Sequence, residues 1–254
     1  MTTRRMGLSK ALRLGLITAA CASLFATGVQ AQNRYPEKPV RVLVGYAPGG
    51  LPDTVARVVS QKLGERWGQQ VVVENRAGAN GSIAADAAQN AAPDGYTLFV
   101  SDNSTHAINP FLYKKLAYDP AKIPPIAMLA RAPLYLAAHS SFPANSLAEM
   151  VAVIKANPGK YTYGSSGIGS THHLCMEFLK ASLGLEMTHV PYQGTGKSVP
   201  ALLAGDVPMV WSAYPSLASQ AKEGKIKLLA VNSLRRSSSA PNLRSEEHTS
   251  ELQS

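Results

Sequence analysis

Four loops rich in glycine, serine and threonine are the parts of this sequence best suited to chemistry. Each follows a short apolar run and precedes a helical pattern, and the four are Pro48 to Gly50, Ala79 to Ser82, Ser165 to Thr171 and Gln193 to Gly196. A helix start presents unpaired N–H groups with partial positive charge, glycine lets a ligand approach the backbone, and hydroxyls add donors. Together the loops predict a site for a small anion, although any one alone is typical of an ordinary turn.

Catalytic and metal chemistry fit the sequence less well. Gln193 to Ser198 resembles a phosphate-binding loop, but Pro191, which lacks an N–H, stands where that motif needs glycine. Gly164 to Ile168 differs from the nucleophile elbow of serine hydrolases, because its fifth residue is not glycine. His172 and His173 are adjacent, so on a helix they point in different directions and do not share a metal. We therefore predict no catalytic residue, no metal and no cofactor.

Alternating strands and helices would position these loops. The expected strands are Val40–Val44, Val71–Glu74, Tyr96–Ser101, Leu134–Ala137, Tyr161–Gly164, Met187–Val190, Val207–Trp211 and Lys227–Val231. Helical patterns lie between them, for example from about Asp53 and after the capping box Ser146 to Glu149. This alternation predicts an α/β protein with parallel sheets, in which loops at the carboxyl ends of the strands bind the ligand.

The first 31 residues have the organisation of a signal peptide. A region with four basic residues is followed by apolar Leu14 to Ala26, which is too short to span a bilayer. Val29 to Ala31 then matches the small-x-small pattern of a cleavage site. We expect export with cleavage near Ala31, by either the general or the twin-arginine route.

The last residues of the sequence, 244 to 254, differ in character from the rest. They show neither a hydrophobic period nor turn chemistry, and they resemble a translated sequencing adapter. We expect that they form no part of the fold and that the natural chain continues differently after Leu243.

Charge and cysteine content narrow the range of partners. The sequence has 25 basic and 16 acidic residues, a net charge of +9. Without the four basic residues before position 32, and without Arg244 and the three acidic residues that follow it, the net charge is +7, which favours an anionic ligand. No basic stretch is interleaved with aromatic residues, so we expect no nucleic acid partner. Cys175 is the single cysteine after residue 31, so we expect no internal disulfide and a small buried side chain.

Several motifs resemble those of one known family, the substrate-binding proteins of tripartite tricarboxylate transporters, or Bug family. The matching stretches within residues 35 to 243 are Tyr35 to Pro39, Ala47 to Asp53, Val73 to Gly81, Pro93 to Thr97, Tyr118 to Pro120, Ser165 to Ser170 with His173 and Leu174, and Val190 to Gly194. Each is weak alone, and the combination is specific. The sequence departs from the family pattern at Ile123 to Pro125, Pro208 and Ser212, so ligand identity does not transfer.

The resemblance implies a two-lobed periplasmic binding protein of type II (Venus-flytrap) with a ligand cleft between the lobes. It would capture a small carboxylate through backbone amides, hydroxyls and ordered waters, and then dock on the membrane permease subunits of a tripartite transporter. The ligand contacts that it implies are Tyr46, Pro48, Gly49, Asp53, Asn80, Gly81, Ser82, Ser166, Gly169, Ser170, Thr171, Tyr192, Gln193, Gly194 and Thr195. We expect a monomer in the periplasm that closes over its ligand by a hinge motion.

The expected organisation has five segments. They are a signal peptide (1–31), a first lobe (32–137) that ends in the crossover strand Leu134–Ala137, a second lobe (138–227), a return to the first lobe (228–243) through the strand Lys227–Val231, and the adapter-like tail (244–254). Two alternatives stay open: an exported hydrolase, or a binding protein that serves a sensor kinase instead of a transporter.

Overall fold

The computed structural model describes residues 35 to 233. The chain divides into two units, residues 1–37 and 38–254, and every element described below belongs to the second. The expected signal peptide, its cleavage near Ala31 and the adapter-like segment 244–254 lie outside the described residues and stay predictions. Within the described part, no helix is long and apolar enough to cross a membrane.

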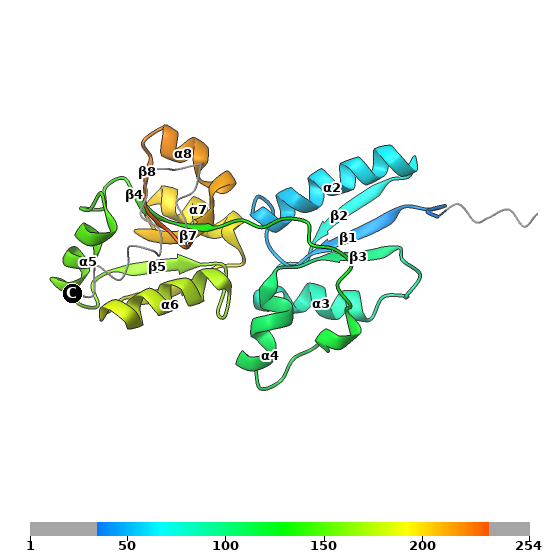
Figure 1. Cartoon of the computed structure of the whole chain (residues 1–254), viewed down its shortest axis with the longest axis horizontal. Helices are drawn as coiled ribbons and strands as arrows, with labels where there is room; N and C mark the ends of the chain where they lie inside the picture. The colour runs from blue at the N-terminus through cyan, green and yellow to red at the C-terminus, as the bar shows by residue number, and fades with distance from the viewer. Residues whose placement is uncertain (1–34, 234–254) are drawn as a thin grey trace, which may run out of the picture. The chain divides into compact units, whose positions relative to one another are not determined.

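The first lobe is built on a three-stranded parallel sheet in the order β2-β1-β3. Its strands are β1 (Val40–Val44), β2 (Val71–Asn75) and β3 (Thr97–Val100), close to the expected ranges. Helices α2 (Leu51–Trp67) and α3 (Ser82–Gln89) cover opposite faces of the sheet (Figure 1). The central strand β1 is almost fully buried, because its branched side chains pack on both faces.

Several short helical turns complete the first lobe. They are a 3₁₀ turn at Ala79–Gly81, a π-helical turn at Ser104–Ile108, α4 (Asn109–Leu112) and a 3₁₀ turn at Pro120–Lys122. The sequence predicted none of the last three, because this stretch has no sustained apolar period. An extended segment then leads into the second sheet (Figure 1).

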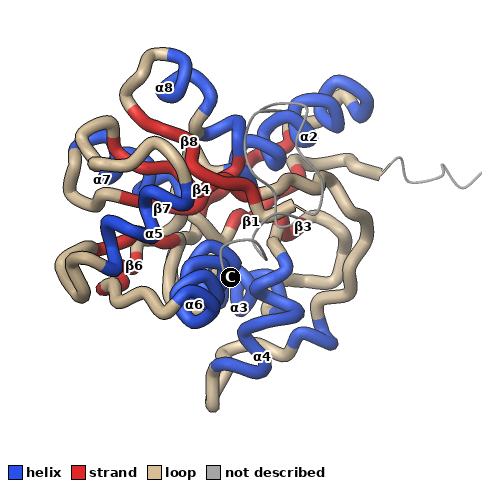
Figure 2. The backbone as a smooth tube through the Cα atoms, turned by 60° about the vertical axis from the view of Figure 1, so that its left-hand side comes forward, coloured by secondary structure: helices blue, strands red, loops and turns tan. Residues whose placement is uncertain are grey.

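The second lobe is built on a five-stranded sheet in the order β6-β5-β7-β4-β8. Its strands are β4 (Leu134–His139), β5 (Thr162–Ser165), β6 (Thr188–Pro191), β7 (Met209–Ala213) and β8 (Ile226–Val231). Its helices are α5 (Leu147–Lys155), α6 (Thr171–Leu183), α7 (Thr195–Ala204) and α8 (Ala218–Lys222), with a 3₁₀ turn at Tyr214–Ser216 (Figure 2). Alternate residues of β4 join two apolar cores: Leu134 and Leu136 pack with α5 and α6, and Tyr135 and Ala137 pack with α7.

Two predictions about the sheets were wrong. The second sheet is mixed instead of parallel, because β4 runs antiparallel to both β7 and β8. In addition, β4 and β8 both belong to this sheet, so Leu134–Ala137 does not close the first lobe and Lys227–Val231 does not return to it. A continuous apolar run identifies a strand buried on both faces, but it carries no information on the sheet or direction of that strand. Sheet membership assigns residues 134 to 231 to the second lobe.

Local signals in the second lobe were more informative. Ser146 caps α5, its hydroxyl accepting a hydrogen bond from the Glu149 N–H at 3.2 Å, as the capping box predicts. Trp211 is buried in the apolar core as a packing residue. Cys175 is partly buried against the same core, and Asn232 Nδ2 donates to its sulfur at 3.4 Å.

Candidate functional site

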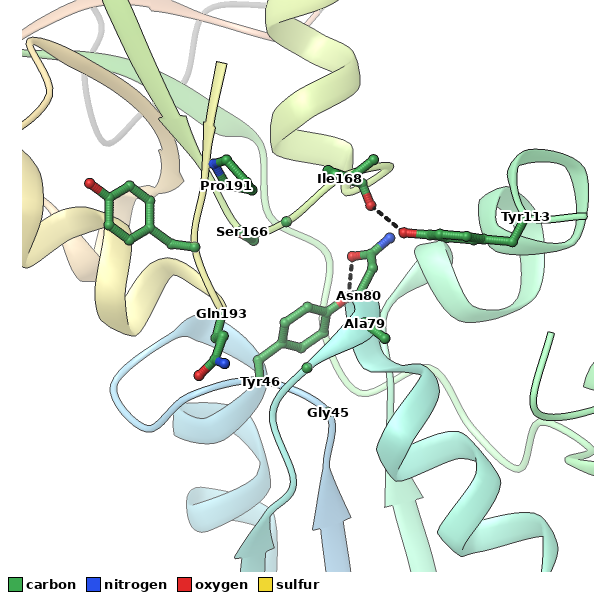
Figure 3. A pocket seen from close by; sticks show the side chains of 12 residues that line it. Gly45, Tyr46, Ala79, Asn80, Tyr113, Ser166, Ile168, Pro191 and Gln193 are labelled. Carbon is green, nitrogen blue, oxygen red and sulfur yellow. Dashed lines mark hydrogen bonds between the residues drawn. The ribbon is translucent and has the colours of Figure 1, made fainter. Parts of the chain in front are cut away.

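A cavity of about 240 Å³ lies among loops of both lobes (Figure 3). Its first-lobe wall consists of Gly45, Tyr46, Gly78, Ala79, Asn80 and Tyr113, and its second-lobe wall consists of Ser166, Gly167, Ile168, Pro191, Tyr192 and Gln193. Most of these residues follow the carboxyl ends of β1, β2, β5 and β6. Parallel strands bring such loops to one edge of a sheet, which is why residues distant in sequence meet here.

Amide and hydroxyl groups hold the first-lobe wall in place. Tyr46 donates its hydroxyl proton to Asn80 Oδ1 at 3.2 Å, and Asn80 Nδ2 donates to Asn109 Oδ1 at 2.9 Å (Figure 3 shows the first of these). Asn109 in turn donates to the Asn80 carbonyl at 3.1 Å and to the Tyr118 hydroxyl at 3.2 Å. Asn80 has left-handed backbone angles (φ 50°, ψ 46°), which asparagine adopts more readily than most residues. The buried Asn109 therefore fixes both the backbone and the amide of Asn80.

A carboxyl group lies behind this wall. Asp102 accepts a hydrogen bond from the Ser104 N–H at 2.9 Å, and burial raises the pKa of Asp102. Burial, and then the nearby Asp102 carboxyl, raise the pKa of Tyr46 well above its usual value. Tyr46 therefore presents a neutral hydroxyl at every physiological pH.

Imidazole groups hold the second-lobe wall. Ser165 Oγ lies 2.6 Å from His189 Nε2, and Ser166 Oγ lies 2.8 Å from His172 Nδ1. The Gly169 N–H donates to His173 Nδ1 at 3.2 Å, so that this nitrogen carries no proton. Three histidines, from α6 and β6, thus anchor the single loop that supplies Ser166 to the cavity.

The histidines occupy an environment that favours their neutral form. The rings of His173 and His189 stack with centroids 4.1 Å apart, and Tyr163 stacks on His189 at 4.9 Å. Burial lowers the pKa of His172 to about 4, and burial together with the charge of His173 lowers that of His189 to about 4. Glu177 accepts hydrogen bonds from the Tyr163 hydroxyl and, at 2.7 Å, from Lys180 beside this stack.

The cavity lining carries no ionised side chain among the described residues. Its polar groups are the tyrosine and serine hydroxyls, the amides of Asn80 and Gln193, and the backbone. Within the same part of the chain, no group of three or more histidine, cysteine or acidic side chains is placed to hold a metal ion. This arrangement can bind a polar ligand by neutral hydrogen bonds.

The structure brings together only part of the expected contact set. Tyr46, Asn80, Ser166, Tyr192 and Gln193 line the cavity. The other expected contacts lie near these residues along the chain but do not line the cavity. They are Pro48, Gly49, Asp53, Gly81, Ser82, Gly169, Ser170, Thr171, Gly194 and Thr195. Whether any of these residues touches a ligand stays a prediction.

Three of the residues that do not line the cavity have evident structural partners. Asp53 is buried and accepts hydrogen bonds from the Gly49 N–H at 3.0 Å and from Asn75 Nδ2 at 2.9 Å, so it shapes the loop after β1. Ser170 caps α6 by accepting from the His173 N–H at 3.2 Å. Thr171 donates to Asn103 Oδ1 of the first lobe at 2.9 Å.

Sequence reasoning missed Tyr113, which closes one side of the cavity. It follows α4, and its hydroxyl donates to the Ile168 carbonyl of the second lobe at 2.8 Å (Figure 3). No motif in the sequence marked this tyrosine. The Asn109-Pro110 pair, a start signal for a short helix, was the one local indication that the chain turns here.

A family model described as the tripartite tricarboxylate transporter family receptor matches residues 55–252. The match includes part of segment 244–254, whose adapter-like origin stays a prediction. A UPF0065 protein of Bordetella pertussis is 37% identical over 213 residues, covering 84% of this chain and 66% of the relative. The chain spans about two thirds of the length of the curated relatives it matches.

Solved structures of two Rhodopseudomonas palustris proteins are also similar. One, described with adipate, has a TM-score of 0.81 at 32% identity and covers 84% of this chain and 72% of its own. The other, MatC with bound malate, has a TM-score of 0.79 at 32% identity and covers 84% and 73%. A third, the periplasmic binding protein BugD, has a TM-score of 0.79 at 33% identity and covers 85% and 72%. These likenesses confirm the two-lobed α/β fold of periplasmic binding proteins. By sequence and by fold, the chain belongs to the tripartite tricarboxylate transporter receptor family, as its motifs indicated.

Proposed function

We propose that this protein is a periplasmic solute-binding receptor that captures a small carboxylate and releases it unchanged to the membrane subunits of a tripartite transporter. The observation that carries the proposal is the composition of the cavity: both lobes contribute neutral hydroxyl and amide groups. Such groups stabilise a carboxylate by hydrogen bonds without a fixed counter-charge, which suits a ligand that must later leave.

The ligand contacts belong to the proposal. Tyr46 and Asn80 of the first-lobe wall and Ser166, Tyr192 and Gln193 of the second-lobe wall carry hydroxyl or amide groups at the cavity. Because the two walls come from different lobes, a ligand bonded to both favours the closed arrangement over an open one.

The proposed ligand class is a compact dicarboxylate. Two structurally similar proteins are described with adipate and with malate, each of which has two carboxylates. The cavity volume, about 240 Å³, lies below the range of about 300–1,000 Å³ that is usual for small-molecule sites. This size favours a short ligand. We further propose a monomeric protein without catalytic activity.

A thermal-shift screen of the full chain tests the receptor function. We expect malate, adipate or a related dicarboxylate at millimolar concentration to raise the unfolding midpoint by several degrees, because ligand binding to the folded state alone stabilises it. Amino acids and aromatic monocarboxylates serve as comparison ligands, and we expect them to give smaller shifts. The absence of a shift with every carboxylate, checked by titration calorimetry, would contradict the proposal.

One observation favours a second candidate, an exported hydrolase. Ser166 lies on the cavity wall with its hydroxyl 2.8 Å from a histidine nitrogen, which is the spacing of a nucleophile and its base. Incubation of the protein with the stabilising ligand and its methyl esters, followed by NMR, separates the two functions. A receptor returns all of them unchanged, whereas turnover that Ser166→Ala abolishes supports the hydrolase.

A further inference from the structure

Two of the glycine loops that the sequence associated with an anion contact each other, and of their residues only Gln193 lines the cavity. Pro48 to Gly50 follows β1 in the first lobe, and Gly194 to Gly196 opens α7 in the second. The Ala47 N–H donates to the Gln193 carbonyl across this contact at 2.9 Å. We call these two segments, with Ala47 and Gln193, the glycine contact.

The glycine contact is packed backbone against backbone. A Cβ atom at Gly196 would stand 1.9 Å from the Pro48 carbonyl oxygen, and one at Gly194 would stand 3.1 Å from Tyr46 Cβ. A Cβ atom at Gly50 would stand 2.7 Å from Thr195 Oγ1. Side chains at these three positions would therefore hold the two loops apart.

Local backbone geometry does not explain two of these glycines. Gly196 lies in the first turn of α7 with an ordinary negative φ, and Gly50 is extended with φ −81° and ψ 169°. Alanine adopts both conformations without strain and is a better helix former than glycine. The reason for glycine at these positions is thus the approach of the other lobe.

We propose that Gly50 and Gly196 are positioning residues for ligand capture. They let the lobes meet closely enough for Ala47 to bond Gln193, and the neighbouring Tyr46 and Gln193 thereby reach the same cavity. This inference rests on the proposed receptor function. It reassigns the two loops from ligand contact to closure.

Two contacts between the lobes outside the glycine contact support this assignment. Tyr113 donates to the Ile168 carbonyl at 2.8 Å, and Thr171 donates to Asn103 at 2.9 Å, each joining the two lobes (Figure 3 shows the first). The two lobes therefore touch at the glycine contact and again where Tyr113 bonds Ile168, and the cavity lies between these two places.

Gly196→Ala tests the inference in the full chain, with Gly64→Ala in α2 as the matched control. Gly64 is also helical, but the nearest atom to a Cβ there belongs to Gln69 of the same lobe. We expect Gly196→Ala to lower the affinity for adipate or malate about tenfold, because it disfavours the closed state. Amide hydrogen exchange of Ala47, measured without ligand, should accelerate by a similar factor. Neither quantity should change in Gly64→Ala, and the unfolding midpoint should not fall in either variant.

A second pair of variants covers the case in which Gly196→Ala folds poorly. Gly50→Ala should show the same losses, and Gly50→Ala combined with Thr195→Ala should recover them, because the obstructing hydroxyl is gone. Wild-type affinity and wild-type Ala47 protection in Gly196→Ala and in Gly50→Ala would overturn the inference. If the wild-type protein binds neither acid, the ligand proposal fails, and exchange at Ala47 still decides the role of the glycines.

Discussion

The two walls of the cavity present similar groups to a ligand but rest on different chemistry. Behind the first-lobe wall, Asn109 and Tyr118 form a neutral amide–hydroxyl network, with one carboxyl group, Asp102, beside it. Behind the second-lobe wall, His172 and His189 anchor the serine loop, and both favour their neutral form. The walls should therefore respond to acid in opposite directions.

The directions follow from which state holds the proton more tightly. The folded protein binds a proton on Asp102 more readily than the unfolded chain does, so the contribution of Asp102 to stability grows as the pH falls through its raised pKa and is complete below the ordinary value of 3.8. His172 and His189 have pKa values of about 4 in the fold, below the ordinary 6.5. The unfolded chain therefore takes up protons first, and their contribution is lost as the pH falls from about 6.5 to 4.

Removal of the Asn109 amide should have the largest effect. Asn109→Leu removes the protein partners of two groups of the buried Asn80, its carbonyl and its Nδ2, so we expect a loss of about 3 kcal/mol in the free energy of unfolding. Denaturant unfolding at pH 7 measures it. Asn90→Leu, at an exposed amide bonded to Asp86, is the control and should cost less than about 0.5 kcal/mol. Equal losses in the two variants would show that the network does not support the first-lobe wall.

Acidification should weaken the second-lobe wall by a smaller amount. Between pH 7 and pH 5 we expect the more buried His172 to lower the free energy of unfolding by about 2 kcal/mol and the less buried His189 to lower it by a smaller amount, because the unfolded chain protonates histidines that the fold keeps neutral. The combination of His172→Asn with His189→Gln, which keeps a nitrogen near each bonded position, should remove most of this loss. Unfolding curves at both pH values measure both chains.

Asp102→Asn tests whether the carboxyl group behind the first-lobe wall and the histidines behind the second-lobe wall respond to acid in opposite directions. This variant lacks the group that gains stability in acid, so its loss between pH 7 and about pH 4 should exceed that of the wild-type protein. A smaller loss in Asp102→Asn would mean that the carboxyl and the histidines do not act in opposite directions.

The smallest effects should come from the hydroxyls themselves. Tyr46→Phe and Ser166→Ala each remove one neutral hydrogen-bonding group from a different wall, so each should lower the affinity for adipate or malate about three- to tenfold at pH 7. Because the two side chains share no hydrogen-bond partner, their effects should add within about 0.5 kcal/mol. Titration calorimetry of the two single variants and the double variant measures the coupling. Coupling above about 1 kcal/mol would contradict independent walls.

The strands were predictable from the sequence, because short apolar runs bounded by turns are typical of buried β-strands. All eight expected strands are present, and each of their ends lies within two residues of the expected limit. The place of β4 and β8 in the second sheet was not predictable, because strand pairing depends on partners distant in sequence. Residues 101 to 122 were also missed, because short 3₁₀ and π turns leave no apolar period.

The candidate site was predictable as a set of loops but not as a set of contacts. Tyr46, Asn80 and Ser166 follow strand ends and do line the cavity, as the loop positions predicted. Glycine, in contrast, serves equally for ligand approach, a turn or close packing, so composition did not distinguish the glycine contact from the cavity. Tyr113 lies at the cavity because the fold places the end of α4 beside Ile168 of the other lobe, and no local sequence pattern indicates that placement.

The pairing of β4 with β8 also has a consequence for the order of folding. The first-lobe sheet uses only residues between Val40 and Val100, so it can assemble as soon as this continuous stretch has been synthesised. The second sheet joins Tyr135 to Val231, so β4 lacks one neighbour until the end of β8 is available. During that interval one edge of β4 has unpaired backbone N–H and C=O groups, which leaves this strand open to mispairing in an incomplete chain.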